Sequence, residues 1–192
     1  MRNIRLMIVE DDPVWMKCLC NYIGKESDII IVKQIYTKEE AFQVSCNDID
    51  VVLLDLTLSE NDENLSGLEV ANELYNRGLK KIIILTSWDE KEVILEAFDK
   101  GAINYVTKLS YRDIPKVIRE ANCSKVSLHS DVSTVLINEI KTERKIKVLT
   151  PSEREVYKLK EQGLNKNQIA TILYKSIETI KKQIQMINKK LK

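Results

Sequence analysis

Five short aliphatic runs recur along the first 121 residues, and each is followed by an amphipathic segment. The runs occupy residues 4–9, 29–33, 50–54, 81–85 and 103–106. They are continuously apolar rather than alternating, as is typical of strands that are covered on both faces. The segments at 13–24, 38–46, 67–77, 89–100 and 111–121 fit helices. Five such repeats predict an α/β domain with a five-stranded parallel sheet and helices on both faces.

Local signals predict where these helices begin and end. Three segments read as capping boxes, in which a hydroxyl residue precedes a glutamate by three positions: Thr37–Glu40, Ser66–Glu69 and Ser87–Glu90. Three glycines stand where helices should stop: Gly24, Gly78 and Gly101. We therefore expect each helix to start close to its capping residue.

Charged and hydroxyl side chains follow four of the five predicted strands. Glu10 and Asp11 follow the first strand, Asp55 the third, Thr86 the fourth and Lys108 the fifth. Because the carboxyl ends of parallel strands line one crevice, these side chains should meet there. Such a set predicts a cation site beside a phosphoryl site. Taken singly, each residue is more often an ordinary polar residue at a strand end.

The last 45 residues differ from the rest in pattern and charge. Residues 148–192 carry 10 Lys and Arg against 4 Asp and Glu, a net of +6, whereas the other 147 residues carry 20 against 25, a net of −5. Three helices are predicted, with caps at Thr150–Glu153, Asn165–Gln168 and Ser176. A helix, a short helix, a tight turn and a longer basic helix describe a helix-turn-helix domain. The positive charge predicts a polyanionic partner.

Residues 123–147 are predicted to link the two domains. A helix over 131–140 would gather its apolar residues on one side: Val132, Val135, Leu136, Ile137 and Ile140. No stretch approaches 18 uncharged apolar residues, and the N-terminus lacks a signal-peptide layout, so we expect a cytoplasmic protein without a membrane partner. The four cysteines and His129 show no zinc spacing, and we expect buried or idle thiols.

The residues at the strand ends, together with Tyr105, resemble the receiver domain of two-component response regulators. The resemblance covers residues 3–122 and implies a receiver domain over 1–122 with a flavodoxin-like (βα)5 fold. It also implies a sensor histidine kinase as phosphodonor, Mg²⁺ or Mn²⁺ as cofactor, and no independent enzyme activity. Asp55 would be the phosphoacceptor. The implied metal ligands are Glu10, Asp11, Asp55 and the backbone carbonyl of Thr57.

The resemblance also implies a switch. Lys108 and the Thr86 hydroxyl would bind the phosphoryl oxygens, and the Tyr105 ring would turn inward when Thr86 moves. The alternative for Tyr105 is a simple core or surface tyrosine. Asp12, which directly follows the acidic pair, is expected to cap a helix rather than bind a metal.

Three features depart from the family pattern. Leu109 follows Lys108 where the family usually has proline after a cis bond. The segment from Asp55 to Gly67 is longer than usual, and its acidic part, 60–64, is expected to be a solvated excursion; the alternatives are kinase recognition or extra cation affinity. Trp88 should border the phosphoryl group and restrict attacking water, unless it only packs at a helix start.

Residues 148–191 resemble the LuxR-type helix-turn-helix of NarL/FixJ-type regulators. The matching residues are Leu149–Pro151, Glu153–Val156, Gly163–Leu164, Ile169–Ala170, Leu173, Ser176, Thr179–Lys181, Ile187 and Lys190–Leu191. In the third helix the predicted core face is Ile177, Ile180, Ile184 and Ile187. Lys181, Lys182 and Gln185 are expected to read base edges, while Lys166, Asn167 and Thr179 would contact phosphates. Gln183 replaces the family's usual histidine.

Together these patterns predict a transcription regulator that binds double-stranded DNA and is switched by phosphorylation of Asp55. The alternatives are a phosphorylation-independent DNA-binding regulator, or a regulator whose C-terminal domain binds a protein. The family domain continues into a fourth helix, whereas this sequence ends at Lys192. We therefore expect any homodimer to form through the receiver or linker, and the three-helix tail to need support from one of them.

Overall fold

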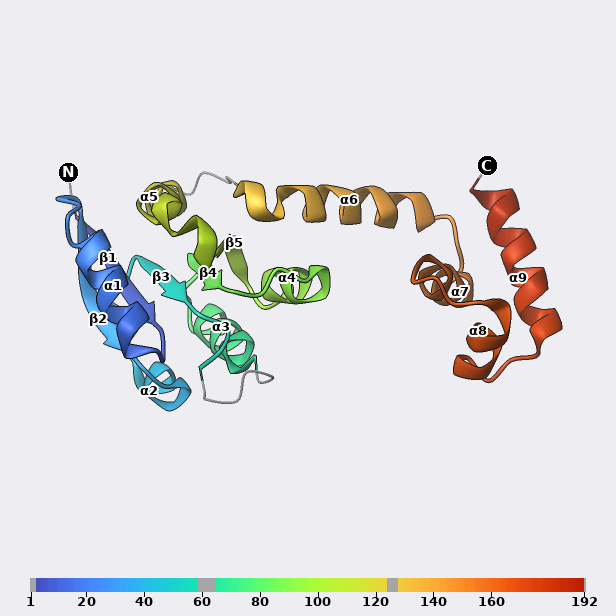
Figure 1. Ribbon diagram of the computed structural model, residues 1–192, viewed down its shortest axis with the longest axis horizontal. Coiled ribbons are helices and arrows are strands. Elements are labelled where there is room, and N and C mark those ends of the chain that lie inside the picture. The colour runs from blue at the N-terminus through green and yellow to red at the C-terminus, as the bar shows by residue number, and fades with distance from the viewer. Residues whose placement is uncertain (1–2, 59–64, 124–127, 192) are drawn as a thin grey trace. The chain divides into compact units, whose positions relative to one another are not determined.

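The computed structural model describes residues 3–58, 65–123 and 128–191, which form two compact units (Figure 1). The first unit spans residues 1–136 and the second spans residues 137–192. The predicted linker is thus divided between them. Among the described residues, no helix has the length and apolarity needed to cross a bilayer.

Unit 1 is built on the parallel sheet that the sequence predicts. The strands are β1 (Ile4–Val9), β2 (Ile29–Ile35), β3 (Val51–Leu54), β4 (Ile82–Thr86) and β5 (Ala102–Thr107). They pair in the order β2-β1-β3-β4-β5, all in parallel. The chain moves outward from β1 to β2 and then crosses back to β3, so β1 and β3 are neighbours near the centre of the sheet. Ligands of such sheets bind where the strand order reverses, at the carboxyl ends of these two strands.

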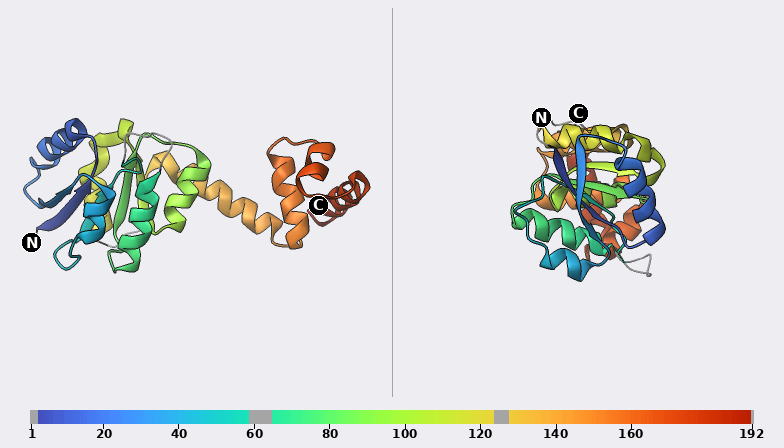
Figure 2. Two further views of the ribbon diagram at one scale, coloured as in Figure 1. Left: turned by 90° about the horizontal axis from the view of Figure 1, so that it is seen from below. Right: turned by 90° about the vertical axis from the view of Figure 1, so that its left-hand side faces the viewer.

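Helices cover both faces of the sheet, which explains the continuously apolar strands (Figure 2). The helices are α1 (Pro13–Ile23), α2 (Lys38–Gln43), α3 (Ser66–Asn76), α4 (Lys91–Asp99) and α5 (Ile114–Asn122), with a 3-10 helix, η1, at Lys108–Asp113. Along β1, Leu6 and Ile8 pack in the cluster that includes α1 and α5, whereas Met7 and Val9 pack with α2, α3 and α4. Each buried aliphatic side chain contributes roughly 1.5–3 kcal/mol to the free energy of unfolding.

Two of the three predicted capping boxes in unit 1 are wrong. Ser66 lies inside α3, is buried and accepts no cap hydrogen bond, and α4 starts only at Lys91, beyond Ser87. In α3 the cause is close packing, because a Cβ on Gly67 would lie 2.2 Å from the carbonyl oxygen of Asp55. This contact pulls the start of the helix onto the end of β3 and buries the serine. Thr37 does cap α2, by accepting a hydrogen bond from the Glu40 amide.

Unit 2 confirms the helical pattern of the tail. Its helices are α7 (Pro151–Glu161), α8 (Lys166–Ile172) and α9 (Ile177–Lys190). Both predicted capping boxes are present, and Ser176 caps α9. Ile180 and Ile187 are buried and Ile184 is partly buried, but Ile177 is 44% exposed, so its assignment to the core is wrong. As the first residue of α9 it points past the helix end, because helical side chains lean toward the N-terminus.

The linker helix, α6 (Ser130–Ile146), is longer than predicted. Val132 is buried in the core of unit 1, with Val135 and Leu136 packed at its edge, and Ile146 is buried in the core of unit 2. Ile137 and Ile140, which the sequence assigns to the same apolar side, are 49% and 57% exposed. They lie in the middle of the helix, beyond the turns that reach either core.

Candidate functional site

Three carboxylates meet where β1 and β3 end side by side. One oxygen each from Glu10, Asp11 and Asp55 lies within 4.8 Å of the others, and Glu10 and Asp55 are only 1% and 4% exposed. Because unpaired buried negative charges repel one another, such a cluster needs a cation. Carboxylate oxygens in this number fit a hard divalent ion such as Mg²⁺. The structure thus brings together the three predicted carboxylate ligands.

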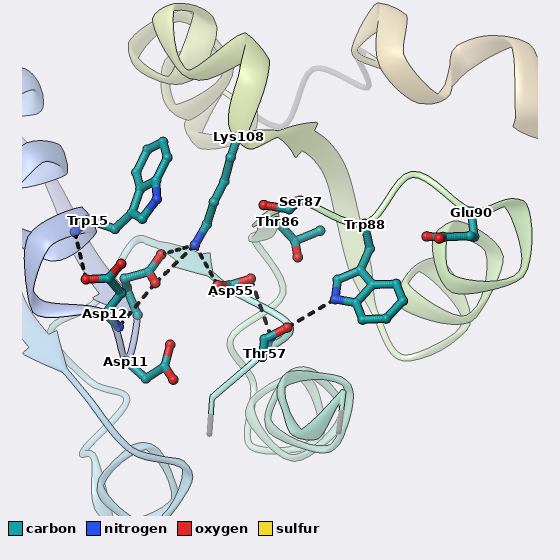
Figure 3. A pocket seen from close by; sticks show the side chains of 11 residues that line it. Asp11, Asp12, Trp15, Asp55, Thr57, Thr86, Ser87, Trp88, Glu90 and Lys108 are labelled. Carbon is teal, nitrogen blue, oxygen red and sulfur yellow. Dashed lines mark hydrogen bonds and ion pairs between the residues drawn. The ribbon is translucent and has the colours of Figure 1, made fainter. Parts of the chain in front are cut away.

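Among the described residues, the ammonium group of this site comes from Lys108, directly after β5 (Figure 3). Its Nζ lies 2.7 Å from Asp55 Oδ2 and 2.9 Å from Glu10 Oε2. Burial opposes the charge on Lys108, but the two carboxylates outweigh it and raise the lysine pKa. Burial and then the charge of Asp55 raise the pKa of Glu10 to about 7, against the opposing effect of Lys108. One ammonium therefore does not neutralise the cluster.

Asp55 is held rigidly at the end of β3. Its Oδ1 accepts a 2.6 Å hydrogen bond from the Leu56 amide and a 3.4 Å bond from the Thr57 amide. Its own amide donates to the Val9 carbonyl. These bonds orient the carboxylate toward the cavity, with Oδ2 facing Lys108. A fixed carboxylate beside an ammonium is suited to accept a group that carries negative charge.

Thr86 and Tyr105 occupy adjacent strands beside the carboxylates. The Thr86 hydroxyl is buried and has no hydrogen-bond partner within the described part of the chain. A buried donor without a partner is suited to a ligand oxygen. Tyr105 is fully buried, and its hydroxyl donates to the Trp88 carbonyl at 2.7 Å. Burial raises the tyrosine pKa. The ring is therefore already in the inward position that the switch hypothesis assigns to one of its two states.

The carboxylates open into a cavity of about 550 Å³. Its lining residues are Glu10, Asp11, Asp12, Trp15, Asp55, Thr57, Thr86, Ser87, Trp88, Glu90 and Lys108. Trp88 borders the cavity, and its Nε1 donates to Thr57 Oγ1 at 3.1 Å. Asp12 caps α1 by accepting from the Val14 amide at 2.7 Å, as expected. The acidic segment 60–64 lies outside the described residues.

One residue of the cavity wall escaped the sequence reasoning. Trp15 lies in the first turn of α1, and the Lys108 ammonium lies 5.0 Å from the centre of its ring. A cation over an indole ring is held by the ring's quadrupole. The signal available in the sequence was an aromatic residue three positions after a capping aspartate, which is not specific. The loop geometry after β5 is also settled: the Lys108–Leu109 bond is trans, and Leu109 is 94% exposed.

The predicted nucleic-acid contacts lie on the exposed side of unit 2. Lys166 and Asn167 begin α8, and Lys181, Lys182 and Gln185 are exposed on α9. Two of these six side chains have partners: Lys181 pairs with Glu178 at 3.6 Å, and Thr179 Oγ1 lies 2.8 Å from Ser176 Oγ.

Two residues near these positions behave differently. Gln183 faces α7, because its Nε2 donates to Ser152 Oγ at 2.8 Å, so it belongs to the packing of the domain. Tyr174, in the turn between α8 and α9, is 97% exposed and has φ 51°. Sequence reasoning gave no role to this tyrosine.

Comparisons with known proteins agree with this geometry. A family model described as "Response regulator receiver domain" matches residues 6–119. The nitrate/nitrite response regulator protein NarL of Escherichia coli (strain K12) is 28% identical over 195 residues, covering 97% of this chain and 88% of NarL. The response regulator protein VraR of Staphylococcus saprophyticus is 26% identical, with coverage of 98% and 90%. The response regulator RcsB, in a structure with DNA, matches with a TM-score of 0.66 at 23% identity, covering 99% of this chain and 92% of RcsB.

Proposed function

Because this chain belongs to the response regulator receiver domain family, we propose that it is a transcription regulator in which phosphorylation of Asp55 switches DNA binding by residues 148–192. The observation that carries the proposal is the buried Asp55 carboxylate, fixed by backbone amides and lying 2.7 Å from Lys108 Nζ. It has the charge, orientation and neighbours that a phosphoacceptor requires.

In the proposed reaction the Asp55 carboxylate attacks the phosphorus of a phosphohistidine on a sensor kinase. A P–O bond forms to Asp55, and the P–N bond to the imidazole breaks. The imidazole keeps the electron pair and takes up a proton. Lys108 and the Thr86 hydroxyl then donate to the phosphoryl oxygens. The protein carries out this transfer on itself, and we assign it no independent enzyme activity.

Glu10, Asp11, Asp55 and the Thr57 carbonyl are the groups that would hold Mg²⁺ or Mn²⁺. When bound, such an ion would supply positive charge that offsets the negative charge of these carboxylates and of the incoming phosphoryl group. The carboxylates fit the role because three of their oxygens lie within 4.8 Å of one another. Burial also raises the pKa values of Glu10 and Asp11, as does the charge of Asp55, which shows how poorly the site tolerates its uncompensated charge.

The switch we propose begins at the buried Thr86 hydroxyl. It lacks a partner among the described residues, so a phosphoryl oxygen would satisfy it and draw Thr86 toward Asp55. The Tyr105 ring on the neighbouring strand is already inward and fully buried, and the movement of Thr86 would favour this packing over the outward one. Phosphorylation would thereby shift the population between two packings.

The proposed output is binding to double-stranded DNA through α8 and α9. Lys181, Lys182 and Gln185 would reach base edges, and Lys166, Asn167 and Thr179 would contact phosphates. All six residues are exposed. We also propose a cytoplasmic protein that forms a homodimer through the receiver or the linker. Ile137 and Ile140, exposed on α6, support the linker as part of that surface.

The proposal is tested in two steps on the whole chain. Intact mass spectrometry after incubation with a small phosphodonor and Mg²⁺ should show one added phosphoryl group, absent in Asp55→Asn. A gel shift with promoter DNA should then show tighter binding by the phosphorylated protein. Uptake by Asp55→Asn would contradict the assignment of the phosphoacceptor. DNA binding that ignores phosphorylation would favour a constitutive regulator, and binding without a steep salt dependence would favour a protein partner.

A further inference from the structure

Lys108 opens a segment whose first turn has little packing of its own, although Tyr111, later in the segment, packs against Tyr22. It follows β5 as the 3-10 helix η1, which begins without a side-chain cap and departs from helical geometry at Ser110 (φ −93°, ψ 21°). Leu109 is 94% exposed and adds no packing. Yet Lys108 Nζ must stay within 2.7 Å of Asp55 and 2.9 Å of Glu10. Contacts from outside this turn must therefore fix the backbone on either side of Lys108.

Asp131, in the first turn of α6, contacts this segment on both sides of Lys108. Its Oδ2 accepts from the Thr107 amide at 3.0 Å and from Thr107 Oγ1 at 2.9 Å. Its Oδ1 accepts from Ser110 Oγ at 3.2 Å. One carboxylate thus ties the residue before Lys108 to the residue two places after it. Hydrogen bonds to an ionised acceptor are stronger than those between neutral groups.

Asp131 is itself held in place from two directions. Val132, the next residue, is fully buried in the core of unit 1. His129 Nδ1 lies 3.3 Å from the Asp131 amide nitrogen and 3.2 Å from Asp131 Oδ2, and its Nε2 lies 3.0 Å from Asp113 Oδ2. The His129 amide donates to Asn104 Oδ1, on β5. The position of the Asp131 carboxylate is therefore fixed by unit 1, and its hydrogen bonds fix the backbone around Lys108.

We propose that Asp131 is a positioning residue for the phosphoryl-transfer site, holding Lys108 against Asp55 by clamping Thr107 and Ser110. The inference rests on the proposed function, and it gives the linker helix a part in the chemistry of the receiver. Loss of the clamp should let Lys108 Nζ withdraw from the carboxylates and from the Trp15 ring, which lies 5.0 Å away.

Trp15 provides a direct readout of where Lys108 lies. The chain has two tryptophans, so a Trp88→Phe background leaves Trp15 as the single reporter. In that background Asp131→Ala should shift the Trp15 emission toward the spectrum of Lys108→Ala. The rate of phosphoryl uptake from a small phosphodonor should fall about tenfold, as small misplacements of a catalytic group do. Asp131→Asn keeps one acceptor oxygen and should stay within about threefold of the parent.

A second comparison separates positioning from general damage to the fold. In a Lys108→Ala background, Asp131→Ala should lower the rate by less than about twofold, because the group through which it acts is absent. Asp99→Ala is the control, because this exposed carboxylate at the end of α4 is not one of the groups that hold Thr107, Ser110 or His129. It should leave the emission unchanged. If Asp131→Ala fails to fold, Ser110→Ala and Thr107→Val remove single bonds of the clamp and should each lower the rate about twofold.

The proposal would be overturned by an unchanged Trp15 emission in Asp131→Ala, or by an equal loss of rate with and without Lys108. Failure of the proposed function has a different result: the parent protein would take up no phosphoryl group, with Mg²⁺ present. The emission of Trp15 does not depend on that reaction. It would still decide whether Asp131 positions Lys108.

Discussion

The two units of this protein differ in where their functional charges lie, which is buried in unit 1 and exposed in unit 2. In unit 1, Glu10, Asp55 and Lys108 are buried together at the end of the sheet, with side chains 1%, 5% and 12% exposed. In unit 2, the lysines of α8 and the outer face of α9 lie in solvent, and Lys181 is 50% exposed beside Glu178. Buried charges interact strongly because the surroundings screen them poorly, whereas exposed charges are screened by water and salt.

This difference in burial suits unit 1 to respond to an added charge and unit 2 to bind a polyanion. A buried cluster responds sharply to one added charge, because each of its members is already held by the others. An exposed basic surface changes little in itself, but it remains available to a polyanion and releases counterions when it binds. The same residue type, lysine, therefore has two roles according to the element that carries it.

The largest expected effect comes from a substitution that disrupts the packing of α3 against the end of β3. In Gly67→Ala the added Cβ would meet the Asp55 carbonyl oxygen at 2.2 Å, so the backbone of β3 or α3 must shift. We expect a loss of about 4 kcal/mol in the unfolding free energy of unit 1. Both tryptophans belong to unit 1, so their fluorescence in urea measures it.

Gly78→Ala is the matched control for this prediction. Gly78 has φ 102° but no atom within 4 Å of an added Cβ. Its cost is then backbone strain alone, roughly 1–2 kcal/mol. Equal losses in the two variants would show that the contact with Asp55 is not tight.

The second prediction compares a buried lysine with an exposed one. Lys108→Met leaves Glu10 and Asp55 buried without their cation, and we expect a loss of about 3 kcal/mol in the unfolding free energy of unit 1. Lys182→Met, on the exposed face of α9, should change stability by less than about 0.5 kcal/mol. It should instead weaken DNA binding and reduce the slope of log affinity against log salt by about 1. A gel shift at several salt concentrations measures the slope; an unchanged slope would remove Lys182 from the interface.

The third prediction concerns pH and unit 1. The pKa of Glu10 is raised to about 7, from an ordinary value of 4.5, by burial and the Asp55 charge. A raised pKa gives stability that is fully present below about pH 4.5 and is lost as the pH rises through about 7. The loss should be of order 1–3 kcal/mol. Tryptophan fluorescence in urea between pH 5 and 8 should show it (about the range in which Glu10 titrates).

Two comparisons sharpen this result. Glu10→Gln should flatten the decline, while Glu155→Gln, on the exposed side of α7, should keep it. Saturating Mg²⁺ should also oppose the decline, because a bound cation favours the ionised carboxylate. A decline that persists in Glu10→Gln would assign the titration to another group.

The smallest expected effect is a pH dependence of the stability of unit 2, opposite in sign to that of unit 1. Glu153 Oε2 lies 2.7 Å from Lys190 Nζ and 2.8 Å from the Thr150 amide, and these partners hold the glutamate pKa below its ordinary value. A lowered pKa gives stability that is present above the ordinary value and is lost as the pH falls. The helical signal of unit 2 should therefore become less resistant to urea on acidification below about pH 4.5. Glu153→Gln should remove this dependence.

Much of the fold and the central part of the site were predictable from local sequence. The five strands, the two capping boxes of unit 2 and the glycine stops depend on neighbours in the chain, and they are present. The meeting of Glu10, Asp11, Asp55 and Lys108 followed from one rule, that parallel strands end at one edge. The errors share a cause. Ser66, Ser87 and Ile177 each fit a local pattern, but their surroundings depend on what packs against them.

The sequence by itself determined which residues lie at the ends of the strands, and therefore which chemistry the site can support. Only the tertiary structure decided how that chemistry is held. Trp15 beneath the Lys108 ammonium, Gly67 against the Asp55 backbone and Asp131 across the Lys108 loop join residues from separate elements. No periodicity records such contacts, because they arise from the packing of elements rather than from the period within one.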